Sequence, residues 1–192
     1  FLLSLDFVNS SVRIFNHSRV RILSRNMNVS EFELEQEVKQ IISFGLESNN
    51  TIMTLHKICG LNNWAIGEVW LPDATEDFMK CEYTVSRNNK AFADVSRFSA
   101  FCKFAKGVGF IGQAWITGDI ITSEDVSKNH DFLRSDIVLE SGLKAVICIP
   151  ALYREEVGAV CCYFLEKLTQ RDLQIAKLLH HYSNELGTII CD

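Results

Sequence analysis

Residues 144–165 read KAVICIPALYREEVGAVCCYFL, two apolar runs on either side of a short charged segment. The first run, 144–149, is rich in β-branched residues and predicts a strand, which we expect Pro150 to end. Arg154-Glu155-Glu156 predicts a hairpin turn, and 157–165 predicts a second, nearly continuous apolar strand. Strands joined by so short a turn pair antiparallel.

A helix is predicted on each side of the strand-forming part of the chain. Ser30 and Glu33 have the spacing of a capping box, in which a hydroxyl and a carboxylate satisfy each other's backbone donors, and Thr169 and Asp172 have it again near the C-terminus. The apolar stripes expected on these two helices are Leu34, Val38, Ile41 and Ile42, and Ile175, Leu178, Leu179, Tyr182, Leu186 and Ile190.

A second hairpin is predicted nearer the N-terminus. Residues 64–71 predict a strand that Pro72 stops, and 78–85 alternate with polar residues as the second strand of the hairpin. Before them, Ser48-Asn49-Asn50 weakens or breaks the first helix, and a further helical run closes at Gly60.

The region between the hairpins is predicted to be helical and looped. Residues 91–106 are helix or loop, 107–112 form a tight glycine loop, and 113–117 form a short helix. A short strand over 120–122 and a helix over 131–140 follow. Paired strands with helices packed on them indicate an α+β fold with an antiparallel sheet.

Length and charge limit the class of protein. The chain has 192 residues, 47% of them hydrophobic, enough for one domain with a sizeable core. We expect 1–28 to be an N-terminal extension of uncertain structure and 29–192 to be the domain. A net charge of −5 argues against a nucleic-acid binder, and the arginines at 13, 19, 21 and 25 are read as a solvated face rather than a phosphate-binding strip. No apolar run reaches the ~18 residues of a membrane span.

The cysteines favour a reducing environment. The chain has 7 cysteines, an odd number, without any Cys-x-x-Cys pair. The histidines are not spaced with them as zinc ligands are, so we expect no metal site and read the cysteines as small buried thiols. The sequence therefore predicts an intracellular location, which is either the cytoplasm or the lumen or stroma of an organelle.

Five motifs follow one another between residues 64 and 160. They are Trp64 with GEVWL at 67–71, GVGFIGQAW at 107–115, ITSEDV at 121–126, GLKAVICIP at 142–150 and VGAV at 157–160. In this order and spacing they resemble the GAF domain family, over residues 50–190. The resemblance implies a central antiparallel sheet of five to six strands with helices on both faces, as in GAF and PAS domains. The first and last helices would share one face, and a pocket would lie on the other face, under residues 91–140.

The function that the resemblance implies is a noncatalytic regulatory or sensory module with a mostly apolar pocket for a small apolar or aromatic ligand. Its pocket candidates are Phe98, Phe101, Cys102, Trp115, Phe132 and Cys148, with Thr122 and Asp125 as polar groups. No cofactor can be named. The alternative is a structural or interaction subunit of a larger complex, in which the pocket is collapsed and holds no ligand. Partners in either case are a second copy, forming a homodimer, or another subunit, through the terminal helices.

A third function, that of a free methionine sulfoxide reductase, is disfavoured because the required thiols are absent. Such GAF relatives carry a thiol in the glycine turn, where this chain has Ile111, and another in a segment that reads Asn-His-Asp-Phe at 129–132. We therefore expect no enzymatic activity. The Cys-His pair through which GAF relatives attach a bilin pigment is absent from this chain. Of the residue pattern of GAF relatives that bind cyclic nucleotides, residues 166–173 keep only Lys167 and Asp172.

Two further features are given a structural interpretation. His130 is read as a solvated loop residue rather than a ligand of metal or haem. The glycine loop 107–112 is read as a tight turn rather than an anion site.

Overall fold

The computed structural model describes residues 29–192, and the expectations for 1–28, including the arginine cluster, lie outside the described residues. The chain divides into two units, Phe1–Glu33 and Leu34–Asp192, and the sheet and both of its cores belong to the second. Among the described residues, no helix is both long and apolar enough to cross a membrane.

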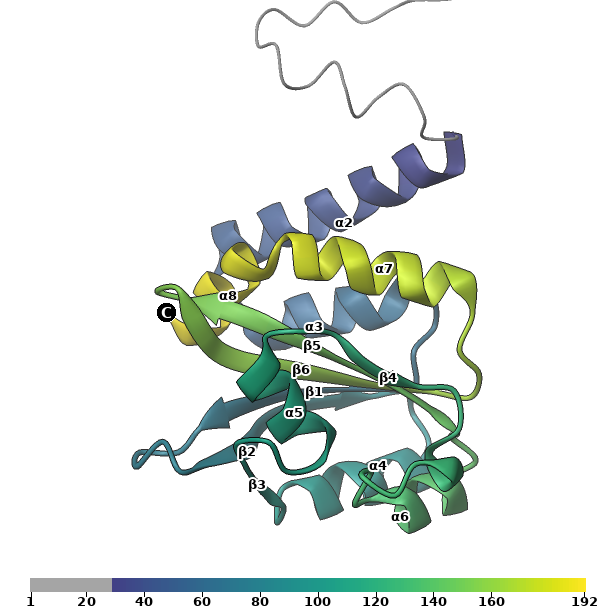
Figure 1. The fold of residues 1–192 in the computed structure, drawn as a ribbon. Coiled ribbons are helices and arrows are strands. Elements are labelled where there is room, and N and C mark those ends of the chain that lie inside the picture. The colour runs from purple at the N-terminus through teal and green to yellow at the C-terminus, as the bar shows by residue number, and fades with distance from the viewer. Residues whose placement is uncertain (1–28) are drawn as a thin grey trace, which may run out of the picture. The chain divides into compact units, whose positions relative to one another are not determined.

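Six strands of the described chain form one sheet in the order β3-β2-β1-β6-β5-β4, with every neighbouring pair antiparallel (Figure 1). The strands are β1 Ile66–Pro72, β2 Phe78–Ser86, β3 Lys103–Ala105, β4 Ile121–Ser123, β5 Ala145–Tyr153 and β6 Glu156–Leu165. Both predicted hairpins are present, β1–β2 and β5–β6, and they join along β1 and β6. The predicted α+β fold with a central antiparallel sheet is confirmed.

Helices cover both faces of this sheet (Figure 1). The helices are α2 Val29–Ser48, α3 Thr51–Gly60, α4 Lys90–Ser99, α5 Gly109–Thr117, the 3₁₀ helix η1 Val126–Lys128, α6 Ser135–Glu140, α7 Gln170–His181 and α8 Ser183–Cys191. A first core lies between the sheet and α2, α3, α7 and α8, and a second core lies between the sheet and α4, α5, η1 and α6.

The continuous apolar run of the C-terminal hairpin follows from these two cores. Along β6, Cys161, Tyr163 and Leu165 face the first core, whereas Cys162 and Phe164 face the second. Successive side chains of a strand point to opposite faces, so a strand buried on both faces is apolar at every position.

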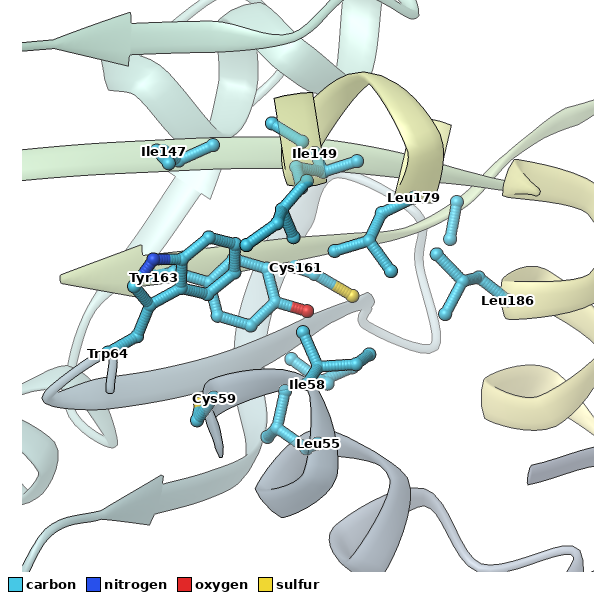
Figure 2. Close-up of a cluster of buried hydrophobic side chains, with 14 of the residues drawn as sticks. Leu55, Ile58, Cys59, Trp64, Ile147, Ile149, Cys161, Tyr163, Leu179 and Leu186 are labelled. Carbon is cyan, nitrogen blue, oxygen red and sulfur yellow. The ribbon is translucent and has the colours of Figure 1, made fainter. Parts of the chain in front are cut away.

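The first core joins the sheet to the C-terminal helices. Figure 2 shows the rings of Trp64 and Tyr163 side by side, and their centroids are 4.6 Å apart. The indole Nε1 of Trp64 donates to Oδ1 of Asp172 at 2.6 Å, while Asp172 also completes the predicted capping box with Thr169. One buried carboxylate therefore both caps α7 and fixes its start against Trp64.

The strand prediction at Pro150 was wrong, because β5 continues through it to Tyr153. On one side Pro150 is paired with Val160 of β6, but on the other side the pairing with β4 reaches only Cys148, opposite Ile121. The missing N–H of proline is therefore harmless at this position, since no partner strand lies on its free side.

Some helix boundaries also differ from the prediction. Helix α2 begins at Val29, so Ser30 lies inside it, and α5 begins within the glycine segment at Gly109. Helix α6 covers only the second half of the predicted 131–140 helix, and the terminal helix is divided at Tyr182 into α7 and α8.

Candidate functional site

The second core surrounds a buried ion pair. Glu68 is 0% exposed and Arg134 is 3% exposed, and Nη1 of Arg134 lies 3.0 Å from Oε1 and 2.9 Å from Oε2 of Glu68. Two charged side chains at such a depth are stable only when they are paired and hydrogen-bonded, so the pair organises the groups around it.

Glu68 reaches this core from the centre of the sheet. It lies on β1 between Ile66 and Trp70, whose side chains face the same core, and it pairs in register with Cys162 of β6. Cys162 pairs in turn with Cys148 of β5, so the three side chains form a row across three strands. The indole Nε1 of Trp70 donates to Oε2 of Glu68 at 2.9 Å and holds that carboxylate oxygen in place.

Arg134 enters the core from outside the sheet. It is the residue before α6, at the end of an irregular segment that follows η1. Its Nη1 also donates to the hydroxyl of Ser99, which in turn donates to the carbonyl of Val95 at 3.0 Å. Its Nη2 lies 3.8 Å from Sγ of Cys162, and its buried Nε has no hydrogen-bond partner among residues 29–192.

Four aromatic rings enclose the guanidinium group. Cζ of Arg134 lies 4.9 Å from the ring centroid of Trp70 and 5.0 Å from that of Phe164. The rings of Phe104 and Phe132 follow at 5.6 Å and 5.7 Å. These distances are within the range of cation–π attraction, which strengthens when water is excluded.

The surroundings keep Arg134 charged. Burial by itself lowers the pKa of the guanidinium group, but the Glu68 carboxylate together with the sulfur atoms of Cys162 and Cys148 raises it more, and the pKa is higher than in water. A carboxylate, a hydroxyl and four rings thus converge on one cationic group. In its charge and its aromatic lining, the arrangement suits a positively charged organic group such as this guanidinium.

Three of the residues predicted for a pocket meet in this core. Trp115 (7% exposed), Phe132 (4%) and Cys148 (0%) all belong to the second core. The Nζ of Lys106 lies over the Trp115 ring, 4.7 Å from the ring centroid.

Of the other five predicted residues, Cys102 packs against the edge of this core and four lie away from it. Phe98 is 45% exposed and Phe101 is 89% exposed, and both line a surface hollow of about 610 Å³ between α4 and α6. Cys102 is half-buried against the second core, and Thr122 is exposed on the edge strand β4. Asp125 caps η1 by accepting from the backbone N–H of Ser127.

Sequence reasoning missed Glu68, Ser99 and Arg134. A signal was present at Glu68, a charged residue in the strand run Ala65–Leu71 that is otherwise apolar, because a buried carboxylate requires a cationic partner. The partner lies 66 positions away in a segment without regular periodicity, and nothing local marks it.

The thiols are held in their protonated form. Burial raises the pKa of Cys59 and of Cys161 to about 12, and burial raises that of Cys162 well above its ordinary value. Sγ of Cys148 lies 3.0 Å from Sγ of Cys162. A thiol must ionise to act as a nucleophile, so these surroundings oppose thiolate chemistry.

The remaining candidates have structural roles in the described part of the chain. In the glycine segment, the N–H of Gly107 donates to the carbonyl of Gly112 at 2.8 Å, and a Cβ on Gly112 would lie 2.1 Å from the carbonyl oxygen of Ala105. His130 is exposed. Among residues 29–192, no group of three His, Cys, Asp or Glu side chains is placed to hold a metal ion.

Comparison with known proteins gives a consistent result for the fold. The family described as GAF domain matches residues 48–181, and no curated protein matches the chain. A free methionine-R-sulfoxide reductase from Neisseria meningitidis, solved with its substrate, is similar with a TM-score of 0.63 and 17% identity over 85% of this chain and 91% of that one.

Two further solved structures are GAF domains of phosphoenolpyruvate-protein phosphotransferases. The Acinetobacter domain has a TM-score of 0.60 and 13% identity over 86% of this chain and 95% of its own. The Coxiella burnetii domain has a TM-score of 0.60 and 12% identity over 82% and 94%. At these identities the likeness concerns the fold alone.

Proposed function

This chain belongs to the GAF domain family, whose members are in general regulatory or sensory modules, and on that premise we propose that it is a noncatalytic regulatory module that closes its interior site with its own Arg134. The observation that carries the proposal is the burial of the Arg134 guanidinium, 3% exposed, between Glu68 and four aromatic rings.

A ligand entering this position would have to remove Arg134 first. Separating a buried ion pair leaves an unpaired charge on each side, which costs about 3–5 kcal/mol when one partner is lost. In the resting protein the interior is therefore a filled core, as in the interaction-subunit hypothesis, and regulation proceeds through protein contacts.

We place those contacts on the terminal helices, which would bind a second copy of this chain or another subunit. The predicted stripes themselves are unsuitable, because Val38 and Leu179 are both 0% exposed and face the first core. Leu46 of α2 is 45% exposed and remains free of that core. The free thiols fit a reducing compartment.

Sensing of a small apolar or aromatic ligand is the second candidate function. It is favoured by the rings of Trp70, Phe104 and Phe164, which lie on strands of the sheet and would line a cavity if Arg134 left its position. It differs from the first candidate in one respect, namely that purified protein would carry a ligand in place of Arg134.

A sulfoxide reductase activity is not proposed. The Neisseria meningitidis enzyme shares the fold, but the glycine segment here carries Ile111, which is 1% exposed within the second core. The nearby thiols of Cys148 and Cys162 are both fully buried.

Native mass spectrometry of the purified wild-type protein tests the proposal. We expect each chain at its bare mass, alone or in a complex with protein, without a bound small molecule. A stoichiometric small molecule released on unfolding would contradict the closed interior and support the second candidate.

A further inference from the structure

We propose that Glu68 and its aromatic neighbours form a recognition site for a guanidinium group, in which Arg134 is the resting occupant and a small guanidinium compound is the exchangeable ligand. This inference rests on the proposed function and names the ligand class of the same site. It gives the second core a role in ligand binding in addition to its role in packing.

The lining of the site is built for a cation. Both carboxylate oxygens of Glu68 face the guanidinium within 3.0 Å, and Trp70 orients the carboxylate by donating to Oε2. A phenyl or indole face is the negative part of the ring, so four such faces favour positive charge and offer nothing to an anion.

The arrangement fits a flat cation with nitrogens on different sides. Nη1 points to Glu68 and Ser99, whereas Nη2 points to Sγ of Cys162 on β6. An ammonium group is a single strongly hydrated centre, whereas guanidinium is less strongly hydrated, presents several donor nitrogens in one plane and stacks on rings. The site therefore selects guanidinium over ammonium.

The resting occupant is imperfectly matched to the site. Nη1, with two hydrogens, serves three acceptor atoms, the two Glu68 oxygens and Ser99 Oγ, whereas the buried Nε has no partner. A buried donor without an acceptor loses the hydrogen bonds that it made to water and gains none in return, so it destabilises the resting arrangement. A free guanidinium compound can rotate and satisfy these donors better than a tethered side chain can.

The segment that carries Arg134 can leave without breaking the sheet. Residues 129–140 pair with no strand of the described chain, and α6 packs mainly against η1 and α4 (Figure 1). Segments held only by side-chain contacts open at lower free energy than sheet strands do. Withdrawal of α6 would move Arg134 and Phe132 together and expose Glu68.

The test uses Arg134→Ala, which deletes the atoms of ethylguanidinium from the site. We expect ethylguanidinium to raise the thermal unfolding midpoint of this variant by roughly 3–6 °C at ~10 times its Kd. Ethylurea, which is flat but neutral, and ethylammonium, which is charged but not flat, should give less than a third of that rise. The double variant R134A/E68Q should lose it, because the carboxylate is gone.

Arg87→Ala is the matched control. Arg87 also lies over an aromatic ring, that of Phe92 at 5.3 Å, but its carboxylate partner is the surface residue Glu166. This variant should not respond to ethylguanidinium. If R134A fails to fold alone, recovery of folded protein on refolding is measured instead, and the same ligand should increase it several-fold over ethylurea.

Exchange in the wild-type chain is measured by hydrogen exchange. Ethylguanidinium at saturating concentration should speed exchange of amides in 129–140 while leaving β1, β5 and β6 protected. If hydrogen exchange in 129–140 is unchanged, Arg134 does not give way to the ligand in the wild-type protein. If ethylurea or ethylammonium stabilises R134A as much as ethylguanidinium does, the proposed ligand class is wrong. If none of the three compounds stabilises R134A, the site does not exist. None of these results affects the closed interior, which native mass spectrometry tests separately.

Discussion

Replacing Glu68 by glutamine removes the negative charge from the buried ion pair while keeping the size of the side chain. The carboxylate accepts two contacts from Nη1 of Arg134 and one from Nε1 of Trp70. An amide keeps one acceptor oxygen, but its NH₂ group would face the donors of Arg134 and compete with them. Arg134 then stays buried with an uncompensated charge.

The expected loss is large relative to the stability of a domain. Breaking a buried pair by removing one partner costs about 3–5 kcal/mol, whereas domains are stable by about 5–15 kcal/mol. Glu68 and Arg134 are 0% and 3% exposed, so solvent does not screen the effect. We therefore expect E68Q to lower the free energy of unfolding by ~3–5 kcal/mol.

Urea unfolding of E68Q, R134M and the double variant measures this loss and its coupling. Each single variant leaves one polar partner stranded, so the double variant should lose less than the sum by at least ~1.5 kcal/mol. If E68Q costs less than ~1 kcal/mol, or if the single losses simply add, the pair does not exist in solution and the reasoning fails.

Three further predictions concern the two cores. Trp115→Ala should destabilise by ~3–5 kcal/mol in urea melts, because the ring is 7% exposed in the second core; a loss under ~1 kcal/mol would refute its burial. The thiols of Cys148, Cys161 and Cys162, each at most 2% exposed, should resist mild alkylation of the native protein, and rapid labelling of all three would contradict this. Burial raises the pKa of Cys59 and Cys161 from 9.0 to about 12, so the unfolded chain loses these protons first. Stability should be intact below pH 9 and fall as the pH rises from 9 towards 12, and Cys161→Ala should make that fall shallower in alkaline melts.

The hairpin β5–β6 could be predicted because its signal is local. A run such as 157–165 and a charged turn specify two paired strands without knowledge of the rest of the chain. The exception at Pro150 depends on how far the edge strand β4 reaches, and that is decided by residues 121–123. Sequence near the proline cannot show it.

The positions of Phe98 and Phe101 were predictable in part. Helix α4 buries Phe92, Val95 and Ser99, which recur at helical spacing and define its inner face. Phe98 follows Val95 by three positions but adjoins Ser99, and its side chain is directed away from that face. Hydrophobicity alone favoured it for the pocket, whereas the helical phase places it towards solvent.

The buried ion pair could not be predicted as a pair. Glu68 stands out within its strand, but the chain has 19 Lys and Arg residues, and any of them could in principle supply the partner. Arg134 is selected by the tertiary arrangement that brings α6 over β1, and by Ser99 at the end of α4. Neither the contact of Arg134 with Glu68 nor its contact with Ser99 produces a repeating pattern in the sequence.

The central claim is that Arg134 fills the interior position of this GAF domain. A crystal structure of the wild-type protein as purified tests it most directly. The account predicts electron density for the Arg134 guanidinium within hydrogen-bond distance of Glu68 and between the rings of Trp70 and Phe164. Density for another molecule at that position, with Arg134 turned out to solvent, would contradict it.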